Sequence, residues 1–581
     1  MNLPSVLKLT LSITVALSLS LATSSYAAVP AIKALVPMGG QAGTTVVVMI
    51  EGTTDKEKHA AVWSSRDDLQ IEPGEKPNQL KITIPENAAP GFAWIRLHTP
   101  EGASNLRPFQ IGTIPEVTET EKNNELDEAF VIEPQTVVVN GVLSSGADVD
   151  VYRVHLEPGQ TVVARMQANS RMGSPMDSVM QVVSPRGFVL KQYDDDLGVD
   201  PMAVYTAAEA GDYYLRLFSF PSKPNQSISF SGSSNYTYRL MVTTGPYVDH
   251  TTPLSVSASE PTALKLFGWN LPRELHEVTL TPTEDATSVK YHHEQIANVV
   301  ELEQTKYPQI IEREPNEKES PQAITLPAVI TGQIHERKDN DRFQFTAAKG
   351  SLYQIRMTSR EKGFPLDPLV RIYDSEGKVL KEVDDISRDN VDFDFDFTFP
   401  ADGEYTIDVR DRFDFGGYRF VYRLEIIPAE PAFDATVAAT KFTLKGGEKL
   451  ELPVTITRKR GYAQKLRFDV KGLPEGVTVE APVSEPTGDS SKKVTLALNS
   501  PYDLTASTPL EIVAVPVLTE TVPNETPNAE NSEPQTREVD GPAQPVVATV
   551  SEMSQQTSDL WLTAIAGEKP KEEPKPEEKK E

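Results

Sequence analysis

Histidine is the side chain that most often performs acid–base or metal chemistry near neutral pH, and this chain of 581 residues has eight of them. They are scattered. His293-Glu294 begins a zinc-binding His-Glu-x-x-His pattern, but Ala297 stands where the second histidine belongs. The chain has no cysteine, which excludes thiol catalysis, and it has no Gly-x-Ser-x-Gly elbow or phosphate-binding glycine loop. The sequence therefore predicts no catalytic residue and a protein that is not an enzyme.

Carboxylates are the abundant ionisable groups. The chain has 84 Asp and Glu against 56 Lys and Arg, which gives a formal net charge of −28. Such a surface repels nucleic acid and anionic lipid, so we expect neither as a main partner. Carboxylate oxygens suit calcium, a hard cation, although solubility alone explains many of them.

Many of these residues recur in two stretches that align with each other, residues 119–247 and 312–428. The interval from Asp367 to Gly377 equals the interval from Asp177 to Gly187. The interval from Gly377 to Asp385 likewise equals the interval from Gly187 to Asp195. The segment Asp339-Asn-Asp341 also matches Asp148-Val-Asp150. A repeat of this length predicts two domains of one type rather than a solenoid. We refer to residues 119–247 as copy one and to residues 312–428 as copy two.

Both copies and their neighbours show the alternation of β-strands. The clearest strand is Asp392–Phe399, where four Phe alternate with Asp and Thr. Alternation places the Phe side chains on one face, which must be buried, and the Asp side chains on the other. The Asp face is interpreted as a solvated outer surface, with a divalent-ion or basic-partner surface as the alternative. Proline (46 residues) outnumbers glycine (33 residues), which favours short strands and turns. The predicted fold class is all-β, with serial antiparallel β-sandwiches, Ig-like and jelly-roll, in several domains.

Copy two resembles the bacterial pre-peptidase C-terminal (PPC) domain. The matching residues are Glu314-Pro-Asn316, Gly332-Gln-Ile, Asp339-Asn-Asp341-Arg-Phe343, Asp367-Pro-Leu369, Tyr373-Asp-Ser-Glu-Gly377, Asp384-Asp385, Gly403-Glu-Tyr405 and Tyr422-Arg-Leu424. Copy one departs from the pattern at Lys122, where the motif has proline. The resemblance implies an antiparallel jelly-roll sandwich in an extracellular or periplasmic setting, carried as an accessory domain.

Related collagen-binding domains of bacterial collagenases bind calcium through a Glu-x-Glu-Pro-Asn-Asp segment and two later aspartates. On this resemblance the candidate metal ligands of copy two are Glu312, Glu314, Asn316, Glu317 and Asp341. The remaining aspartate position holds Lys338 here and Ala147 in copy one. The corresponding positions of copy one are Glu119, Glu121, Asn123, Asn124 and Asp150. The alternative is that the segment is a strand lead-in with Asn at a turn. Calcium is the only cofactor expected.

The flanking segments are similar to other sandwich domains. Residues 29–113 resemble an Ig-like TIG/IPT domain, through Pro37-Met-Gly39-Gly40, Gly52 and Pro90-Gly91. The Leu473-Pro-Glu-Gly476-Val loop is similar to that of Ig-like domains that close many bacterial exported proteins.

The apolar run Leu9–Ala22, followed by Ala27-Ala28, predicts a cleaved export signal, and no later segment is long and apolar enough to span a membrane. The expected order is 1–27 signal peptide, 29–113 TIG/IPT-like sandwich, 114–247 PPC-like sandwich, 248–305 short Ig-like or bridging β unit, 306–428 PPC-like sandwich, 429–566 C-terminal Ig-like sandwich with a disordered insertion at 519–545, and 567–581 disordered charged tail.

These observations predict an exported protein, periplasmic, cell-surface or secreted, that binds an envelope or extracellular protein or a polysaccharide. Two alternatives remain at this point: a self-assembling structural envelope protein, and an accessory component of an exported peptidase system.

Overall fold

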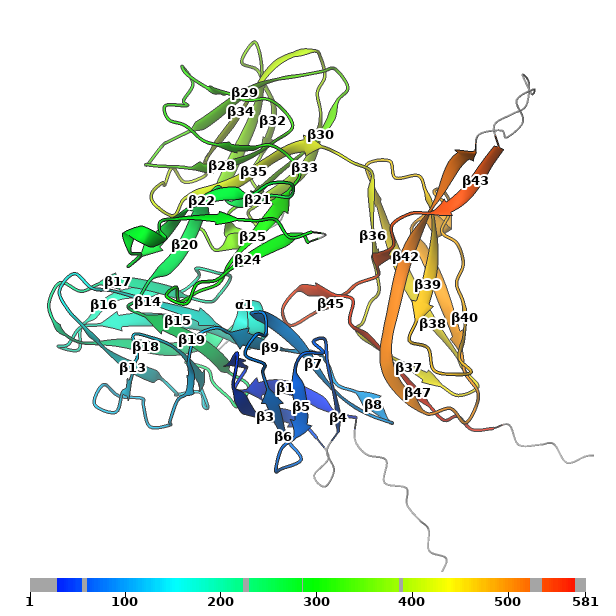
Figure 1. Ribbon diagram of the computed structural model, residues 1–581, viewed down its shortest axis with the longest axis horizontal. Coiled ribbons are helices and arrows are strands. Elements are labelled where there is room, and N and C mark those ends of the chain that lie inside the picture. Colours follow the sequence, from blue (N-terminus) through cyan, green and yellow to red (C-terminus); the bar gives the residue numbers. More distant parts are fainter. Residues whose placement is uncertain are drawn as a thin grey trace, which may run out of the picture.

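The computed structural model describes residues 29–54, 60–222, 229–284, 286–385, 390–522 and 535–569. The all-β prediction is confirmed: ten sheets pair into five sandwiches along the chain (Figure 1). No helix in these ranges is long and apolar enough to cross a membrane. The predicted export signal lies outside the described residues.

The first sandwich packs two sheets over a core that includes Ile32, Val48, Ile95 and Phe109. One sheet has the order β1 (Ala31–Val36), β3 (Thr45–Thr53), β6 (Gln79–Thr83), β5 (Gln70–Pro73). The other has the order β2 (Gly39–Gln41), β9 (Arg107–Gly112), β7 (Gly91–Thr99), β4 (Ala61–Ser64), with β8 (Gly102–Ala103) on β7.

Copy one forms two five-stranded sheets. They are β10 (Glu116–Thr118), β12 (Thr136–Val142), β19 (Thr237–Thr243), β14 (Thr161–Gln167), β17 (Met202–Thr206), and β11 (Phe130–Val131), β13 (Asp150–Leu156), β18 (Gly211–Pro221), β15 (Met176–Val183), β16 (Val189–Tyr193). A one-turn helix, α1 (Asn169–Met172), follows β14 and ends at Gly173, whose φ of 70° suits glycine.

Copy two repeats this order strand for strand. Its sheets are β26 (Gln309–Ile311), β28 (Ala328–Gln333), β35 (Val421–Pro428), β30 (Leu352–Thr358), β33 (Phe393–Thr398), and β27 (Gln322–Ala323), β29 (Asp341–Ala347), β34 (Gly403–Asp411), β31 (Pro368–Asp374), β32 (Val379–Val383). The short helix η2 (Arg360–Lys362) stands where copy one has α1. In both copies the first strand of each sheet pairs parallel and the other pairs are antiparallel. The same topology in both stretches agrees with the repeat seen in the sequence.

A smaller sandwich joins the two copies. It has the three-stranded sheets β20 (Tyr247–Thr252), β22 (Thr262–Trp269), β23 (Glu277–Leu280), and β21 (Ser255–Ser257), β25 (Val300–Thr305), β24 (Ser288–Tyr291), with η1 (Arg273–Leu275). Arg419 of copy two reaches this joint. Its Nε lies 2.9 Å from an Asp249 oxygen of the small sandwich, and its guanidinium donates to the Gly363 carbonyl at 2.8 Å.

The last sandwich contains β36 (Ala432–Thr436), β38 (Lys449–Lys459), β41 (Lys493–Asn499), β40 (Thr478–Glu480), and β37 (Lys441–Lys445), β47 (Leu560–Ile565), β42 (Ala506–Val522), β39 (Lys465–Lys471). Three further elements are β43 (Gln535–Asp540) and β44 (Gln544–Pro545) on β42, and η3 (Asp489–Ser491). The prediction that residues 519–545 are disordered is wrong at both ends of that run, because β42 continues to Val522 and pairs with β43. Residues 523–534 and most of the predicted charged tail lie outside the described residues.

This last sandwich also contacts the first. The hairpin of β45 (Ala548–Val550) and β46 (Gln555–Thr557) reaches back toward it (Figure 1). Trp561 is 2% exposed and packs against Trp63 and His98, at ring-centroid distances of 6.0 and 4.7 Å. The guanidinium of Arg96 lies 5.6 Å from the Trp561 ring. The first and last sandwiches therefore share an aromatic contact in which Trp561 is buried and Trp63 and His98 are half-buried.

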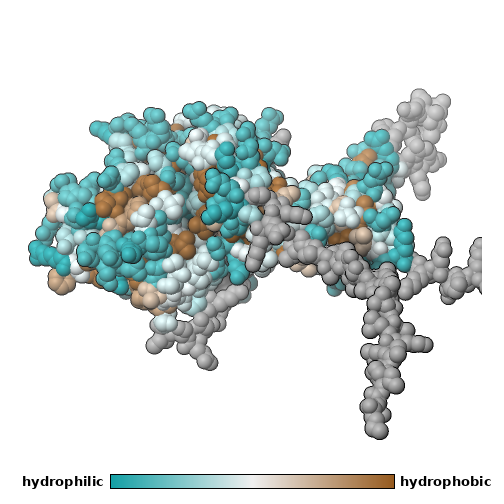
Figure 2. All heavy atoms as spheres, turned by 90° about the horizontal axis from the view of Figure 1, so that it is seen from below, coloured by the Kyte–Doolittle hydropathy of each residue, from teal (hydrophilic) through white to brown (hydrophobic). Residues whose placement is uncertain are grey.

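The predicted Phe face of β33 is buried as expected at Phe393 and is half-buried at Phe395 and Phe397. The expected solvated Asp face is wrong at its first position. Asp392 is 2% exposed, and its carboxylate accepts three backbone N–H groups at the start of η2, at 2.9–3.0 Å. In copy one, the Asp200 carboxylate likewise accepts three backbone N–H groups at the start of α1. On the face seen in Figure 2, hydrophilic residues cover most of the surface and hydrophobic residues form separate patches.

Candidate metal centre

The lead-in segment of copy two lies where its two sheets meet. After β26, the backbone N–H of Glu312 donates to Thr331 of β28, in the first sheet. Four residues later the Asn316 carbonyl accepts the N–H of Arg342 of β29, in the second sheet. The segment therefore crosses one rim of the sandwich, which brings Glu312 and Asn316 together with the first residue of β29.

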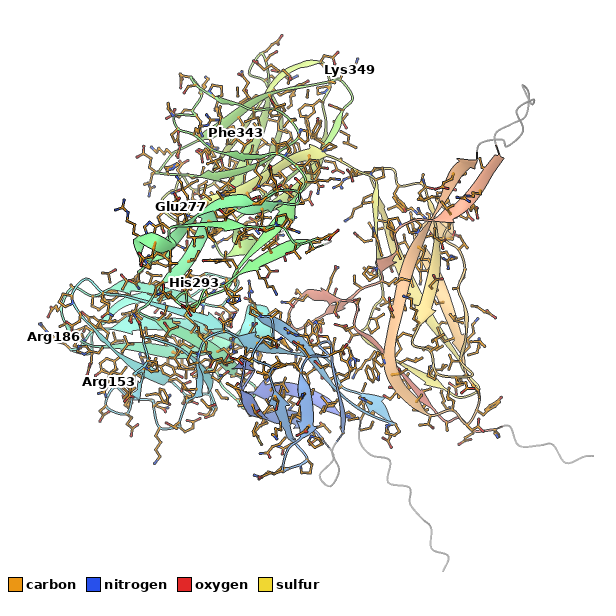
Figure 3. All side chains as sticks on the ribbon, viewed as in Figure 1. Arg153, Arg186, Glu277, His293, Phe343 and Lys349 are labelled. Atoms are coloured by element: carbon orange, nitrogen blue, oxygen red, sulfur yellow. The ribbon has the colours of Figure 1, made fainter. Side chains whose placement is uncertain are left out.

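That first residue is Asp341, and its side chain points inward. Alternation along β29 places it on the same face as Phe343 and Phe345, and all three are buried. Figure 3 shows Phe343 within the upper sandwich of that view. A carboxylate at the inner end of a core strand needs partners, because an unpaired buried charge is strongly destabilising.

The protein satisfies only part of this need. One Asp341 oxygen accepts the Tyr422 hydroxyl, and the other has no donor while both carboxyls are ionised; a proton on either carboxyl would link Asp341 to Glu312. Asn316 donates its amide N–H to Glu312 at 2.8 Å, while its own side-chain oxygen also lacks a donor. Asn316 and Asp341 are both 0% exposed. Two buried oxygens without donors are a feature that a bound cation would explain.

The raised pKa values of Glu312 and Asp341 also point to a bound cation. Burial, with a smaller effect from neighbouring negative charge, raises the pKa of Glu312 to about 7, even though the backbone N–H of Gln333 donates to it. Burial raises the pKa of Asp341 well above its usual value, and the charge of Glu312 raises it further. Two adjacent buried carboxylates cannot both ionise cheaply unless a cation lies beside them.

Three further groups surround this pair. The ligand atoms of Glu312, Glu314 and His335 lie within 4.8 Å of one another, and so do those of Glu314, Asp339 and Asp341. Glu314 is thus common to both groups. The Asp339 carboxylate also accepts the backbone N–H of His335 at 2.7 Å.

The structure therefore brings together four of the five residues expected from the sequence: Glu312, Glu314, Asn316 and Asp341. Glu317 is exposed and belongs to neither of these groups. Asp339 and His335 are additional. Asp339 supplies the carboxylate that the sequence comparison missed because it placed the position one residue earlier, on Lys338. The repeat itself carried the signal, since Asp339 aligns with Asp148.

The donor set fits calcium. Four carboxylates and one amide oxygen are hard oxygen donors, and a calcium site takes six to eight of them, with water completing the shell. Glu312, Glu314, Asn316, Asp339 and Asp341 would hold the ion. Its charge would balance the two buried carboxylates and stabilise the rim where the sheets meet.

In copy one, Glu119, Asn123 and Asp150 occupy the same positions, but their side chains have different hydrogen-bond partners. Glu119 accepts the Tyr152 hydroxyl and the Asn123 amide. The Tyr238 hydroxyl has one hydrogen and lies within hydrogen-bonding distance of two acceptors, Glu119 at 2.9 Å and Asp150 at 2.5 Å. Copy two has Phe343 in place of Tyr152, so it lacks this additional hydroxyl.

Other details of copy one also differ. Burial, followed by the charge of Glu119, raises the pKa of Asp150 to about 9. Glu121 is exposed, and Asn124 donates to Asp148 at 3.2 Å rather than joining the central group. One oxygen each of Asn123 and Asp150 is buried without a partner. Copy two therefore fits a cation better than copy one, whose carboxylates already have hydroxyl donors.

One family model matches part of copy two. Residues 339–411 match the family model of the bacterial pre-peptidase C-terminal domain. A solved pre-peptidase C-terminal domain of a Bacillus anthracis collagenase is similar over 20% of this chain and 99% of its own, at 14% identity and a TM-score of 0.15.

Two larger structures match longer stretches. Domains 1–6 of the surface layer protein SbsC are 11% identical, over 93% of this chain and 55% of that chain, with a TM-score of 0.15. SGBP-B from a Bacteroides ovatus mixed-linkage glucan utilization locus, solved with a mixed-linkage heptasaccharide, is 9% identical over 67% and 73%, with a TM-score of 0.13. No curated protein matches the chain. The PPC assignment of copy one and the TIG/IPT-like and Ig-like assignments stay predictions.

Proposed function

We propose that this chain is a non-catalytic protein of the cell envelope or extracellular space. It binds a macromolecule, a polysaccharide or a protein, through its β-sandwich units, and calcium stabilises copy two. Glu312, Glu314, Asn316, Asp339 and Asp341 hold the ion.

The observation that carries the calcium assignment is the pair of buried oxygens on Asn316 and Asp341 that accept no hydrogen bond, together with the ligand atoms of Glu314 and Asp339 close to Asp341. Copy one has the same two unpartnered oxygens, on Asn123 and Asp150, but no such group of carboxylates among its described residues. The match of residues 339–411 to a PPC domain supports the binding role, because the resemblance implies an accessory module rather than a catalytic one. The five sandwiches in series support it as well, since sheet faces and loop clusters offer binding surfaces.

Thermal unfolding with and without calcium tests the metal assignment. A ligand present at about a hundred times its dissociation constant stabilises the folded state by about 2.7 kcal/mol, so millimolar calcium should raise the melting temperature by several degrees. Glu314→Ala should reduce this rise strongly, and Glu314→Ala with Asp341→Ala should abolish it. Glu121→Ala is the matched control, because Glu121 is the exposed residue at the same position in copy one. A parent protein whose melting temperature does not respond to calcium would end the assignment.

Fractionation of an envelope extract over the immobilised protein tests the binding role. We expect retention of a specific polysaccharide or protein by the monomer. Assembly of the protein with itself as its concentration rises would favour the structural alternative, and turnover of casein would favour the peptidase alternative.

A further inference from the structure

A groove opens at the junction of copy two with the last sandwich. Its volume is about 540 Å³, within the range of ligand sites in proteins. The linker between the units, including Glu430 and Pro431, lines it. Tyr307 and Gln354 contribute to one wall, and Tyr462 and Gln464 contribute to the other.

The charged groups of the groove are already paired with one another. Lys306 Nζ lies 3.1 Å from Glu430, and Arg460 Nε lies 2.9 Å from Asp396. The Arg460–Asp396 pair joins the last sandwich to copy two, whereas Lys306 pairs with Glu430 of the linker. Because each cation is paired with a carboxylate, the described residues of the groove carry no unpaired charge for an ionic ligand to neutralise.

The remaining lining residues are aliphatic side chains and prolines, with aromatic rings and amides among them. The half-buried Tyr462 packs on Phe433 at a ring-centroid distance of 5.0 Å, and the half-buried Tyr307 forms part of the opposite wall. The side-chain amides of Gln464 and Gln544 are exposed and have no hydrogen-bond partner within the described part of the chain. Each amide offers both donors and an acceptor.

We propose that this groove binds a neutral oligosaccharide segment of a polysaccharide. A sugar ring has an apolar C–H face, which packs on an aromatic side chain, and hydroxyl groups that both donate and accept hydrogen bonds, as amides do. Paired charges, two tyrosines and free amides fit these properties together. The inference rests on the proposed binding role and names its site and its ligand class.

An extended peptide fits the walls less well. A peptide that adds as a β-strand needs a free strand edge. The wall strand β42 pairs with β39 on one side and with β43 and β44 on the other, and β30 pairs with both β33 and β35. These two strands therefore present side chains rather than open backbone. The groove strand β36, which contributes Ala432 and Phe433, lies at the edge of its sheet, so a peptide would have only this short edge to pair with.

Binding of the intact protein to an array of short neutral oligosaccharides, including glucan, mannan and chitin fragments, tests this proposal. We expect one sugar class to bind. Gln464→Arg, a change at an exposed position that places bulk and charge in the groove, should weaken that binding at least about tenfold, and Tyr462→Ala should do the same. Gln70→Arg is the control, because Gln70 is exposed on the first sandwich, away from the groove. Melting temperatures of the variants identify any loss caused by unfolding.

Each other result has a distinct meaning. If the parent protein binds sugar and Gln464→Arg binds it equally well, the groove is not the binding site, and the proposed binding role is retained. If the array is blank and a protein is retained from envelope extract, the ligand class falls and the binding role stands. If neither sugar nor protein is retained, both the inference and the proposed binding role are overturned.

Discussion

Calcium binding to copy two should depend steeply on pH. The pKa of Glu312 is raised from 4.5 to about 7 by burial, and that of the adjacent Asp341 is also raised. Without calcium, these carboxyls favour the folded state fully below the unfolded pKa of Glu312, and their contribution is lost as the pH rises through about 7. Calcium binds the deprotonated form, so its stabilising effect should grow over the same interval.

The size of the effect follows from the fraction of Glu312 that is ionised. With a pKa of about 7, about 1% is ionised at pH 5 and about 90% at pH 8, so the apparent affinity should rise about ninetyfold from this group alone. This corresponds to about 2.7 kcal/mol, at 1.36 kcal/mol for each factor of ten. A second proton released from Asp341 would make the dependence steeper.

Titration calorimetry at pH 5, 6, 7 and 8, in two buffers with different heats of protonation, measures both quantities. We expect the dissociation constant to fall about tenfold per pH unit below 7, and at least one proton to be released per ion at pH 6. Glu312→Gln should bind more weakly with a shallower pH dependence, and Glu119→Gln in copy one should keep the parent slope. Equal affinity at pH 5 and pH 8 would refute the reasoning, because the buried carboxyl pair would then carry no proton for calcium to displace.

Three further predictions concern the contacts that hold the units. Asp392→Ala removes the acceptor of three backbone N–H groups and should destabilise copy two by about 2 kcal/mol, measured by urea unfolding; a loss below about 0.5 kcal/mol would contradict the capping role. Trp561→Ala should cost about 3–5 kcal/mol and should also speed amide hydrogen exchange in β7 of the first sandwich, whereas an effect confined to the last sandwich would contradict the shared contact. Arg419→Met should loosen the joint between the small sandwich and copy two and increase the radius of gyration in small-angle scattering, and an unchanged scattering profile would count against it.

Strand alternation was enough to predict the fold class and the buried face of β33, because a core strand needs apolar side chains at every second position. It also contained a signal for the proposed metal centre. Asp341 shares its face with Phe343 and Phe345, so the sequence places a carboxylate inside the core. The sequence could not show that Asp392 is a buried cap, because an acceptor for N–H groups at η2 is recognisable only after the chain has folded back. The pairing of β42 with β43 was missed for a related reason, since the polar residues of both strands resemble a linker.

The two copies differ in how the same backbone surrounds a buried carboxylate pair, and this difference separates the proposed cation site of copy two from the hydrogen-bonded network of copy one. Both place a glutamate, an asparagine and an inward-facing aspartate at the rim where their sheets meet. In copy one, the hydroxyl of Tyr152 reaches Glu119 and Tyr238 and supplies a donor for the buried negative charge. In copy two, the position holds Phe343, which offers no donor, and Asp339 and Glu314 add negative charge instead. A buried carboxylate pair must be balanced by hydroxyl donors, by protons or by a cation. Copy two lacks the extra hydroxyl, so its carboxyl pair must keep a proton or take up a cation, and the carboxylates of Glu314 and Asp339 beside it favour the cation.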